Sequence, residues 1–215
     1  MSSADRRDFL PAAGHDLFLP LYDPLVRWLG FDRSRQELVS QANVKPDHHV
    51  LDIGCGTGSF VVLLKRQYPT IEIVGLDPDP KALRRAEDKI RRAGVSVRLD
   101  RGFADELPYQ TDSFDRVFSS FMFHHLEEDV KRRTLTEVRR VLKPGGSFHL
   151  LDFTADNGSR GYLARLVHSH AMMKDNTDQR LLELMRHAGL TKAEKLKQDS
   201  MFFGLLQSAY YRASA

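Results

Sequence analysis

Apolar and polar positions change their period repeatedly along the chain, and these changes predict alternating strands and helices. Short apolar runs predict strands at about 49–54, 71–77, 95–100, 114–120 and 147–152. Apolar positions spaced three and four residues apart predict helices at about 58–67, 80–93, 128–142 and 177–188. Elements that alternate in this way predict an α/β fold, in which helices cover both faces of a mostly parallel sheet.

The last two extended runs break this alternation. They lie at about 192–200 and 203–212, and the link around Phe203-Gly204 is too short for a crossover helix. An antiparallel hairpin is therefore expected, which gives a Rossmann-like, seven-stranded sheet with one reversed strand at its end. Lys143 to Gly146 is expected to be a turn, and residues 154–176 are polar, with a helical patch at about 160–172.

The N-terminal part precedes the first strand. Leucines recur at three- and four-residue intervals up to Trp28, which predicts an amphipathic helix over about 15–30. A second helix is expected over about 33–42. We therefore predict an N-terminal helical lid over residues 1–44 and a ligand-binding domain over residues 45–215.

Composition narrows the class of protein without identifying it. The chain has 215 residues, 28% of them charged, a net charge of +3 and a single cysteine, Cys55. There is no apolar run of transmembrane length and no secretory signal at the start, so a cytoplasmic protein is expected. The mild basic charge suits an anionic ligand or peripheral membrane contact, but an ordinary solvated surface is the favoured explanation. No basic stripe with interleaved aromatic residues is present, so no nucleic-acid partner is expected.

The segment that points to chemistry is Val50 to Gly58, an apolar strand that breaks into glycines at positions 54, 56 and 58. A strand, a glycine turn and a helix can bring backbone N–H groups close to a nucleotide-like cofactor. The dinucleotide fingerprint would need its third glycine where Ser59 stands, and a P-loop would need a lysine. The spacing therefore disfavours a nicotinamide enzyme, while a turn without a ligand remains the alternative.

Acidic residues follow the predicted strands at the same edge of the sheet. Asp52 precedes the turn, and Asp77 ends the second strand, where a carboxylate can accept hydrogen bonds from a ribose diol. The alternative role for Asp77 is to cap the next helix, which Asp79 could do as well. Asp105 lies in a loop, either as an acceptor for an adenine amine or as a surface carboxylate.

Six segments in order resemble the successive motifs of class I S-adenosylmethionine-dependent methyltransferases. The resemblance is closest to the small-molecule branch that includes the ubiquinone and menaquinone C-methyltransferases, and it is strong over about residues 45–152. The segments are VLDIGCGTG (50–58), GLD (75–77), ADELP (104–108), FD (114–115), FHHL (123–126) and VLKPGG (141–146).

The resemblance implies S-adenosylmethionine as the cofactor, with S-adenosylhomocysteine as the product. It implies that Asp52 lies near the amino group of the cofactor and that Asp77 holds the ribose hydroxyls. The other implied cofactor-binding residues are Gly54, Cys55, Gly56 and Gly58 at the methionine part, Pro78, Ala104 and Asp105 at the adenine, and Ser119 and Ser120 beside the methionine part.

The acceptor is less well indicated than the cofactor. His124 and His125 follow the fourth strand and are candidates for a general base, although a structural role in the loop is the alternative. Tyr22 of the predicted lid is a third candidate, with core packing as its alternative. His168 and His170 could line an acceptor pocket, although a surface position on a helix is the favoured alternative. Because they are two residues apart, they do not share a helix face, so no metal site is expected. We expect methyl transfer to a small, apolar or aromatic acceptor; a regulatory module that binds the cofactor without turnover is the alternative.

Overall fold

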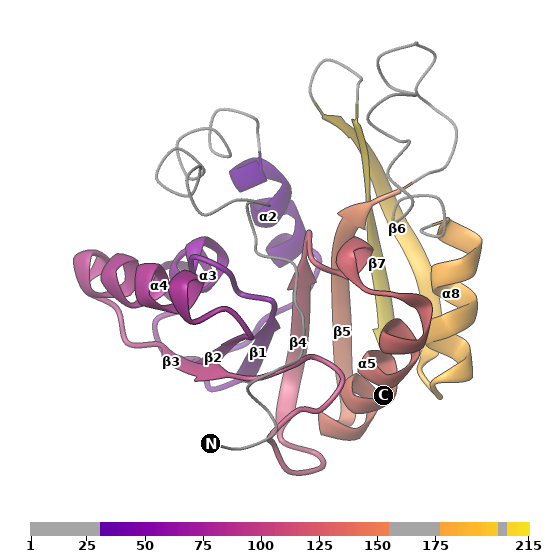
Figure 1. Cartoon of the computed structure of the whole chain (residues 1–215), viewed down its shortest axis with the longest axis horizontal. Helices are drawn as coiled ribbons and strands as arrows, with labels where there is room; N and C mark the ends of the chain where they lie inside the picture. The colour runs from indigo at the N-terminus through magenta and orange to yellow at the C-terminus, as the bar shows by residue number, and fades with distance from the viewer. Residues whose placement is uncertain (1–30, 155–176, 202–205) are drawn as a thin grey trace.

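The computed structural model describes residues 31–154, 177–201 and 206–215. In these ranges the chain forms one seven-stranded sheet with the strand order β3-β2-β1-β4-β5-β7-β6 (Figure 1). The strands are β1 (His49–Ile53), β2 (Glu72–Asp77), β3 (Arg98–Arg101), β4 (Phe114–Ser120), β5 (Leu142–Phe153), β6 (Thr191–Met201) and β7 (Leu206–Ser214).

Strands β1 to β5 are parallel, and β7 is the reversed strand. It pairs antiparallel with β5 on one side and with β6 on the other. The predicted hairpin and the reversed last strand are thus confirmed, and β7 lies between β5 and β6, one place in from the edge of the sheet. Strand β6 occupies the edge, so both neighbours of β7 satisfy its backbone hydrogen bonds.

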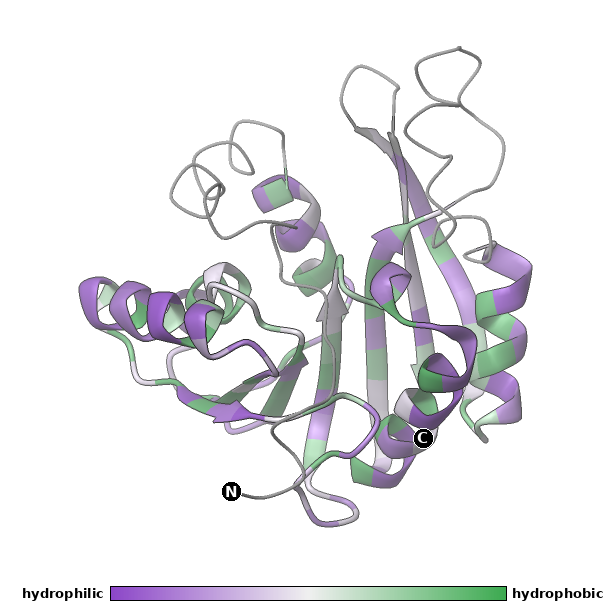
Figure 2. Ribbon diagram, in the orientation of Figure 1, coloured by the Kyte–Doolittle hydropathy of each residue, from purple (hydrophilic) through white to green (hydrophobic). Residues whose placement is uncertain are grey.

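Helices cover both faces of the sheet, as the alternating pattern predicts. They are α2 (Phe31–Ser40), α3 (Ser59–Gln67), α4 (Pro80–Ala93), α5 (Glu128–Val141) and α8 (Asp178–His187), with a short 3₁₀ turn, η3 (Phe123–His125). One apolar core lies between the sheet and α2, α3 and α4, and the other lies between the sheet and α5 and α8. Figure 2 shows the polar sides of the helices turned outward. None of the helices in the described ranges has the length and apolar character needed to span a bilayer.

Local sequence explains where α4 begins and ends. The carboxylate of Asp79 accepts a hydrogen bond from the backbone N–H of Lys81 at 2.8 Å, and Pro80 occupies the first turn. Gly94 ends the helix in the left-handed conformation at φ 65°. Asp79 therefore caps the helix, which leaves the neighbouring Asp77 available for another role.

Two boundaries differ from the sequence prediction. The third strand begins at Arg98, three residues later than expected. Residues 143–146 are not a turn between elements but an irregular part of β5, because Phe114 pairs with Leu142 whereas Arg116 pairs with Ser147. The extra residues bulge out of the ladder, and Gly145 adopts φ 79° there.

Helix α2 belongs to the same apolar core as the sheet. Its Leu38 and Val39 are buried with Val50 of β1 and Leu64 of α3. Residues 1–44 are expected to form a lid. Their described part, which contains α2, packs on the face of the sheet that α3 and α4 also cover. The domain boundary near residue 44 and the helix over 15–30 stay predictions, since residues 1–30 lie outside the described ranges.

A buried histidine on β5 gives a prediction for stability. His149 is 1% exposed, stacks on Phe118 and lies near the charges of Arg116 and Arg212. Burial, assisted by these two charges, lowers its pKa to about 3. The unfolded chain binds a proton that the folded chain does not between about pH 3 and 6.5, so acid reduces stability in this window.

His149→Phe is expected to reduce this pH dependence. The phenyl ring keeps the stacking on Phe118 but cannot titrate. As the pH is lowered from 6 to 5, the free energy of unfolding of the wild type should fall by about 1.4 kcal/mol more than that of the variant. Urea unfolding at several pH values measures both slopes. Equal slopes would show that His149 is not held neutral in the folded protein.

Candidate active site

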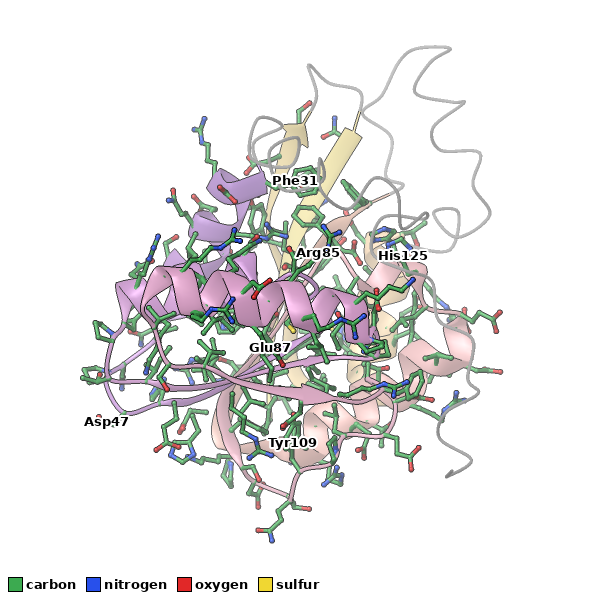
Figure 3. All side chains as sticks on the ribbon, turned by 60° about the vertical axis from the view of Figure 1, so that its left-hand side comes forward. Phe31, Asp47, Arg85, Glu87, Tyr109 and His125 are labelled. Carbon is green, nitrogen blue, oxygen red and sulfur yellow. The ribbon has the colours of Figure 1, made fainter. Side chains whose placement is uncertain are left out.

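The candidate site lies at the carboxyl edge of the parallel strands. Figure 3 shows Phe31 and His125 toward this edge and Tyr109 toward the opposite one. Ligands of open α/β sheets bind outside the carboxyl ends of the strands where the strand order reverses, which here is between β1 and β4. The glycine turn after β1 lies at this reversal.

The glycine turn is fixed to the neighbouring strand through backbone hydrogen bonds. The N–H groups of Gly54 and Cys55 both donate to the carbonyl oxygen of Leu76 on β2, at 2.8 and 3.0 Å. Gly54, Gly56 and Gly58 have φ values of 73°, 54° and 77°, which only glycine adopts without strain. The backbone conformation of the turn therefore requires glycine at positions 54, 56 and 58.

The three glycines meet different surroundings. A Cβ atom on Gly54 would lie 2.5 Å from Cγ of Met122, and one on Gly58 would lie 2.9 Å from Cβ of Ala86 on α4. Within the described part of the chain, nothing lies within 4 Å of a Cβ atom built on Gly56. Gly54 and Gly58 thus allow close packing against their neighbours, whereas Gly56 has open space beside it among the described residues. This is the geometry expected of a turn whose backbone approaches a ligand.

Asp77 holds the turn against the end of β2. One carboxylate oxygen accepts from the N–H of Gly56 at 2.8 Å, and the other accepts from the N–H of Asp79 at 2.9 Å. Burial raises the pKa of Asp77 to about 6, while these hydrogen bonds act in the opposite direction. Each carboxylate oxygen can accept a second hydrogen bond, so Asp77 retains the capacity to bind a diol.

Asp52 is buried without any hydrogen-bond partner. The residue is 1% exposed, and neither carboxylate oxygen has a partner among the described residues. Burial raises its pKa to about 8, and the charge of Arg35 on α2 opposes this increase. A buried, unpaired carboxylate is costly for a folded protein. A ligand group that donates hydrogen bonds or carries positive charge would therefore suit the carboxylate of Asp52, beside the glycine turn.

The residues expected at the adenine follow strands β2 and β3. Asp105 accepts two hydrogen bonds from the guanidinium of Arg133 on α5, at 2.9 and 3.1 Å. It is thus an ion-paired residue, and its contact with adenine stays a prediction. Pro78 and Ala104 are half-buried. Ser119 lies beside Ile53 in the β1–β4 register, and its buried hydroxyl lacks a partner in the described structure.

His124 forms a hydrogen-bonded pair with a carboxylate at the end of β5. Its Nδ1 lies 2.6 Å from Oδ1 of Asp152, and its backbone N–H donates to Oδ2 at 2.7 Å. Asp152 is fully buried and also accepts from the N–H of Phe153. The carboxylate therefore fixes the imidazole with Nδ1 protonated, which leaves Nε2 as the basic nitrogen.

His125 stacks on His124, with the ring centroids 3.9 Å apart. Burial lowers the pKa of His125 to about 4, and the neighbouring His124 acts in the same direction while Asp152 opposes it. His125 is thus neutral near pH 7. The two candidate bases therefore differ. His124 is oriented by the carboxylate of Asp152, whereas His125 is a weak base that packs against the ring of His124.

Comparisons with known proteins identify the family. A methyltransferase-domain profile matches residues 50–146. The chain is 38% identical over 157 residues to the demethylmenaquinone methyltransferase of Deinococcus radiodurans, covering 71% of this chain and 64% of the relative. It is 30% identical over 183 residues to the ubiquinone/menaquinone biosynthesis C-methyltransferase UbiE of Cupriavidus pinatubonensis, covering 73% of this chain and 72% of the relative. The chain belongs to the S-adenosylmethionine-dependent methyltransferases.

A solved structure agrees with this fold. An S-adenosylmethionine-dependent methyltransferase from Aquifex aeolicus superimposes with a TM-score of 0.66 at 18% identity, covering 84% of this chain and 88% of that one. The methyltransferase described here spans 59–64% of the length of four curated relatives named demethylmenaquinone methyltransferase.

The structure brings several predicted site residues of this methyltransferase to one edge. The glycine turn, Asp52 and Asp77 lie together there, as do the two histidines after β4. Cys55 contributes its backbone, because its side chain is buried and would contact any Cβ at Gly75. The remaining candidates, Tyr22, His168 and His170, lie outside the described residues.

Two charged residues at this edge, Asp152 and Arg35, were not predicted from the sequence. Asp152 is the second-last residue of β5, as Asp77 is the last residue of β2, so the same reasoning about strand ends would have found it. Arg35 lies on α2, where the apolar spacing alone does not show which polar side chain turns toward the sheet.

An aromatic cluster lies beside His124 and was also missed. Phe31 of α2, Phe121 after β4 and Phe153 of β5 have ring centroids 4.5–6.2 Å apart, and Phe153 contacts the ring of His124 edge-on at 5.0 Å. Phe121 adopts φ 56°, an uncommon conformation for an aromatic residue. Strained residues of this kind concentrate at functional sites. The cluster forms an apolar wall beside His124.

Proposed function

We propose that the protein transfers a methyl group from S-adenosylmethionine to a small aromatic acceptor. The observation that carries the proposal is the buried, unpartnered carboxylate of Asp52 beside the glycine turn. S-adenosylmethionine carries an ammonium group in its amino-acid tail, and such a group suits this carboxylate because opposite charge compensates the cost of its burial.

The residues at the edge of the sheet fit this cofactor. Asp52 would accept from its amino group, and Asp77 would hold the ribose hydroxyls. Gly54, Cys55, Gly56 and Gly58 would border the methionine part through their backbone, with Ser119 and Ser120 nearby. Pro78, Ala104 and Asp105 would border the adenine. S-adenosylmethionine supplies an activated methyl group when it is bound.

The protein's own contribution is alignment and the exclusion of water. Holding the acceptor in line with the methyl group could supply up to about 7–11 kcal/mol of the barrier reduction. The glycine turn follows β1, and Phe121 and Phe153 lie at the carboxyl ends of β4 and β5. These neighbouring strands can therefore fix two ligands relative to one another. No nucleophilic side chain is required.

The proton of the acceptor would be removed by His124. With Nδ1 held by Asp152, Nε2 is the nitrogen that can accept a proton, and the carboxylate stabilises the imidazolium that results. His125, held neutral by its burial, would pack against the base rather than act as one. Tyr22 of the predicted lid remains a candidate for the same role.

The acceptor class rests on the aromatic cluster and on the names of the relatives. The cluster of Phe31, Phe121 and Phe153 offers a face for an apolar ring. The relatives are named for methylation in menaquinone and ubiquinone biosynthesis, which suggests a quinol-type acceptor. A cytoplasmic location is consistent with such an acceptor if the protein meets the membrane surface only peripherally.

Incubation with methyl-labelled S-adenosylmethionine and a panel of quinols, phenols, thiols and amines tests this function. Label should appear in the quinols or phenols. A protein that binds the cofactor but labels no acceptor would instead support a regulatory module without turnover, a reading that the comparisons do not favour.

Asp152→Asn is expected to lower the rate about 100-fold or more without changing affinity for the cofactor. An amide can hold His124 in the wrong tautomer and does not stabilise the imidazolium. Single-turnover rates and calorimetric titration separate the two effects. The matched control is His125→Gln, which should alter the rate by less than about tenfold. An unchanged rate in Asp152→Asn would exclude the base.

A further inference from the structure

The solvent-facing side of α4 carries a stripe of basic side chains. Ala82, Leu83, Ala86 and Ile90 are buried and turn the opposite side of the helix toward the sheet. The positions that face away from the sheet are spaced three and four residues apart, so they follow one line along the helix. We call these positions the α4 stripe, which consists of Lys81, Arg84, Arg85, Asp88, Arg91 and Arg92.

The excess positive charge of the chain is located on α4. Over Pro80–Ala93 the helix has six basic and two acidic side chains, which give it a net charge of +4. The full chain carries a net charge of +3, so all the other residues together are slightly negative. The basic character of the protein therefore has one place in the fold.

Most of the positive charge of the α4 stripe is not neutralised. Arg84, Arg85 and Arg92 form no ion pair with the residues that the structure describes. The one carboxylate of the stripe, that of Asp88, pairs with Arg91. On α5, by contrast, two exposed arginines each pair with a carboxylate. A row of unpaired cations attracts an anionic surface, and at 0.1 M salt the attraction extends over about 10 Å.

The composition of the α4 stripe favours a lipid surface over a nucleic acid or a protein. Helix α4 contains no aromatic residue on which a base could stack. The stripe has no apolar residue to form the desolvated centre of a protein interface. Basic side chains alone are sufficient for the headgroups of an anionic bilayer. The 14 residues of α4 extend over about 20 Å, so the stripe can contact several headgroups at once.

We propose that the α4 stripe docks the protein on an anionic lipid bilayer. The choice of a bilayer rests in part on the proposed function, because an apolar aromatic acceptor partitions into lipid. Helix α4 begins at Pro80, three residues after Asp77, so its first turn lies at the edge of the sheet that holds the candidate active site. In Figure 3, Arg85 lies on the side of α4 toward the edge with Phe31, and Glu87 lies on the opposite side. Docking through the stripe would therefore bring this edge near the headgroups.

Co-sedimentation with vesicles tests the docking. The probes are vesicles of phosphatidylcholine alone and vesicles of phosphatidylcholine and phosphatidylglycerol in equal amounts. The wild type should bind only the anionic vesicles, and about 1 M salt should release it. The double variant Arg84→Gln, Arg92→Gln removes two exposed charges from the stripe and should bind about 10- to 30-fold more weakly.

The matched control is the double variant Arg132→Gln, Arg186→Gln. It removes two exposed charges from α5 and α8, which cover the other face of the sheet. Because these positions lie away from the stripe, binding to the anionic vesicles should weaken by less than about threefold. Equal losses in the two double variants, or no binding of the wild type to anionic vesicles, would overturn the docking.

The remaining outcomes separate the docking from other partners and from the proposed function. A nucleic-acid duplex that binds more tightly than the anionic vesicles at the same salt would overturn the bilayer as the partner. Methyl transfer to a water-soluble phenol should be equal in the wild type and the stripe variant. If the wild type binds the vesicles through the stripe but transfers no methyl group to any acceptor, the proposed function fails while the docking stands.

Discussion

Asp52→Asn is expected to stabilise the cofactor-free protein and, at the same time, to weaken binding of S-adenosylmethionine. In the folded protein, burial raises the pKa of Asp52 to about 8. The unfolded chain has an ordinary aspartate, so the folded state binds an extra proton between about pH 4 and 8. The free energy of unfolding of the wild type therefore falls as pH rises through this window. Asparagine does not titrate, so the variant does not lose this free energy.

The size of both effects can be estimated. At pH 8 the variant should unfold with a free energy about 1–3 kcal/mol higher than that of the wild type, and the difference should close toward pH 4. Affinity for S-adenosylmethionine should fall about 10- to 100-fold, because the ammonium group loses a charged acceptor. Glu87→Gln, an exposed change on α4, is the control and should do neither. A variant that is less stable than the wild type at pH 8 would contradict the account.

Gly54→Ala is expected to cause a large loss of stability. The new Cβ would lie 2.5 Å from Cγ of Met122, at a backbone φ of 73°. The left-handed conformation costs about 1–2 kcal/mol for alanine, and overpacking adds about 1–3 kcal/mol. A total of about 2–5 kcal/mol is a large part of the stability of an ordinary domain. The urea midpoint of unfolding measures it.

Two further variants separate the causes of this loss. Gly94→Ala has a similar φ of 65° but no atom within 4 Å of the new Cβ, so it should cost only about 1–2 kcal/mol. Met122→Ala removes the side chain that would clash. The double variant should therefore recover about 1–3 kcal/mol relative to the sum of the single changes. Additive effects would show that Met122 does not limit the turn.

Much of the fold was predictable because the apolar runs end abruptly. Val50 to Ile53 is buried on both faces, and the glycines that follow adopt positive φ values, which end the strand. The third strand begins late, because Val95 and Val97 pack on the core as a link rather than as part of the ladder. Residues 143–146 read as a turn, but pairing with β4 on both sides keeps them in β5. Tertiary pairing overrides local turn preference there.

The cofactor side of the site was easier to predict than the acceptor side. The spacing of the glycines and the position of a carboxylate at a strand end can both be recognised in the sequence. The pairing of His124 with Asp152 joins residues 28 positions apart and depends on the relative positions of β4 and β5. The orientation of Arg35 depends on how α2 lies across the sheet. Neither of these is encoded in local periodicity.

Calorimetric titration of the wild-type protein with S-adenosylmethionine tests the central claim most directly. The account predicts a single site with a dissociation constant between about 1 µM and 1 mM, the range common for enzyme substrates. It also predicts a site at least tenfold weaker in Asp52→Asn. No binding by the wild type at about 1 mM, or binding that does not depend on Asp52, would contradict it.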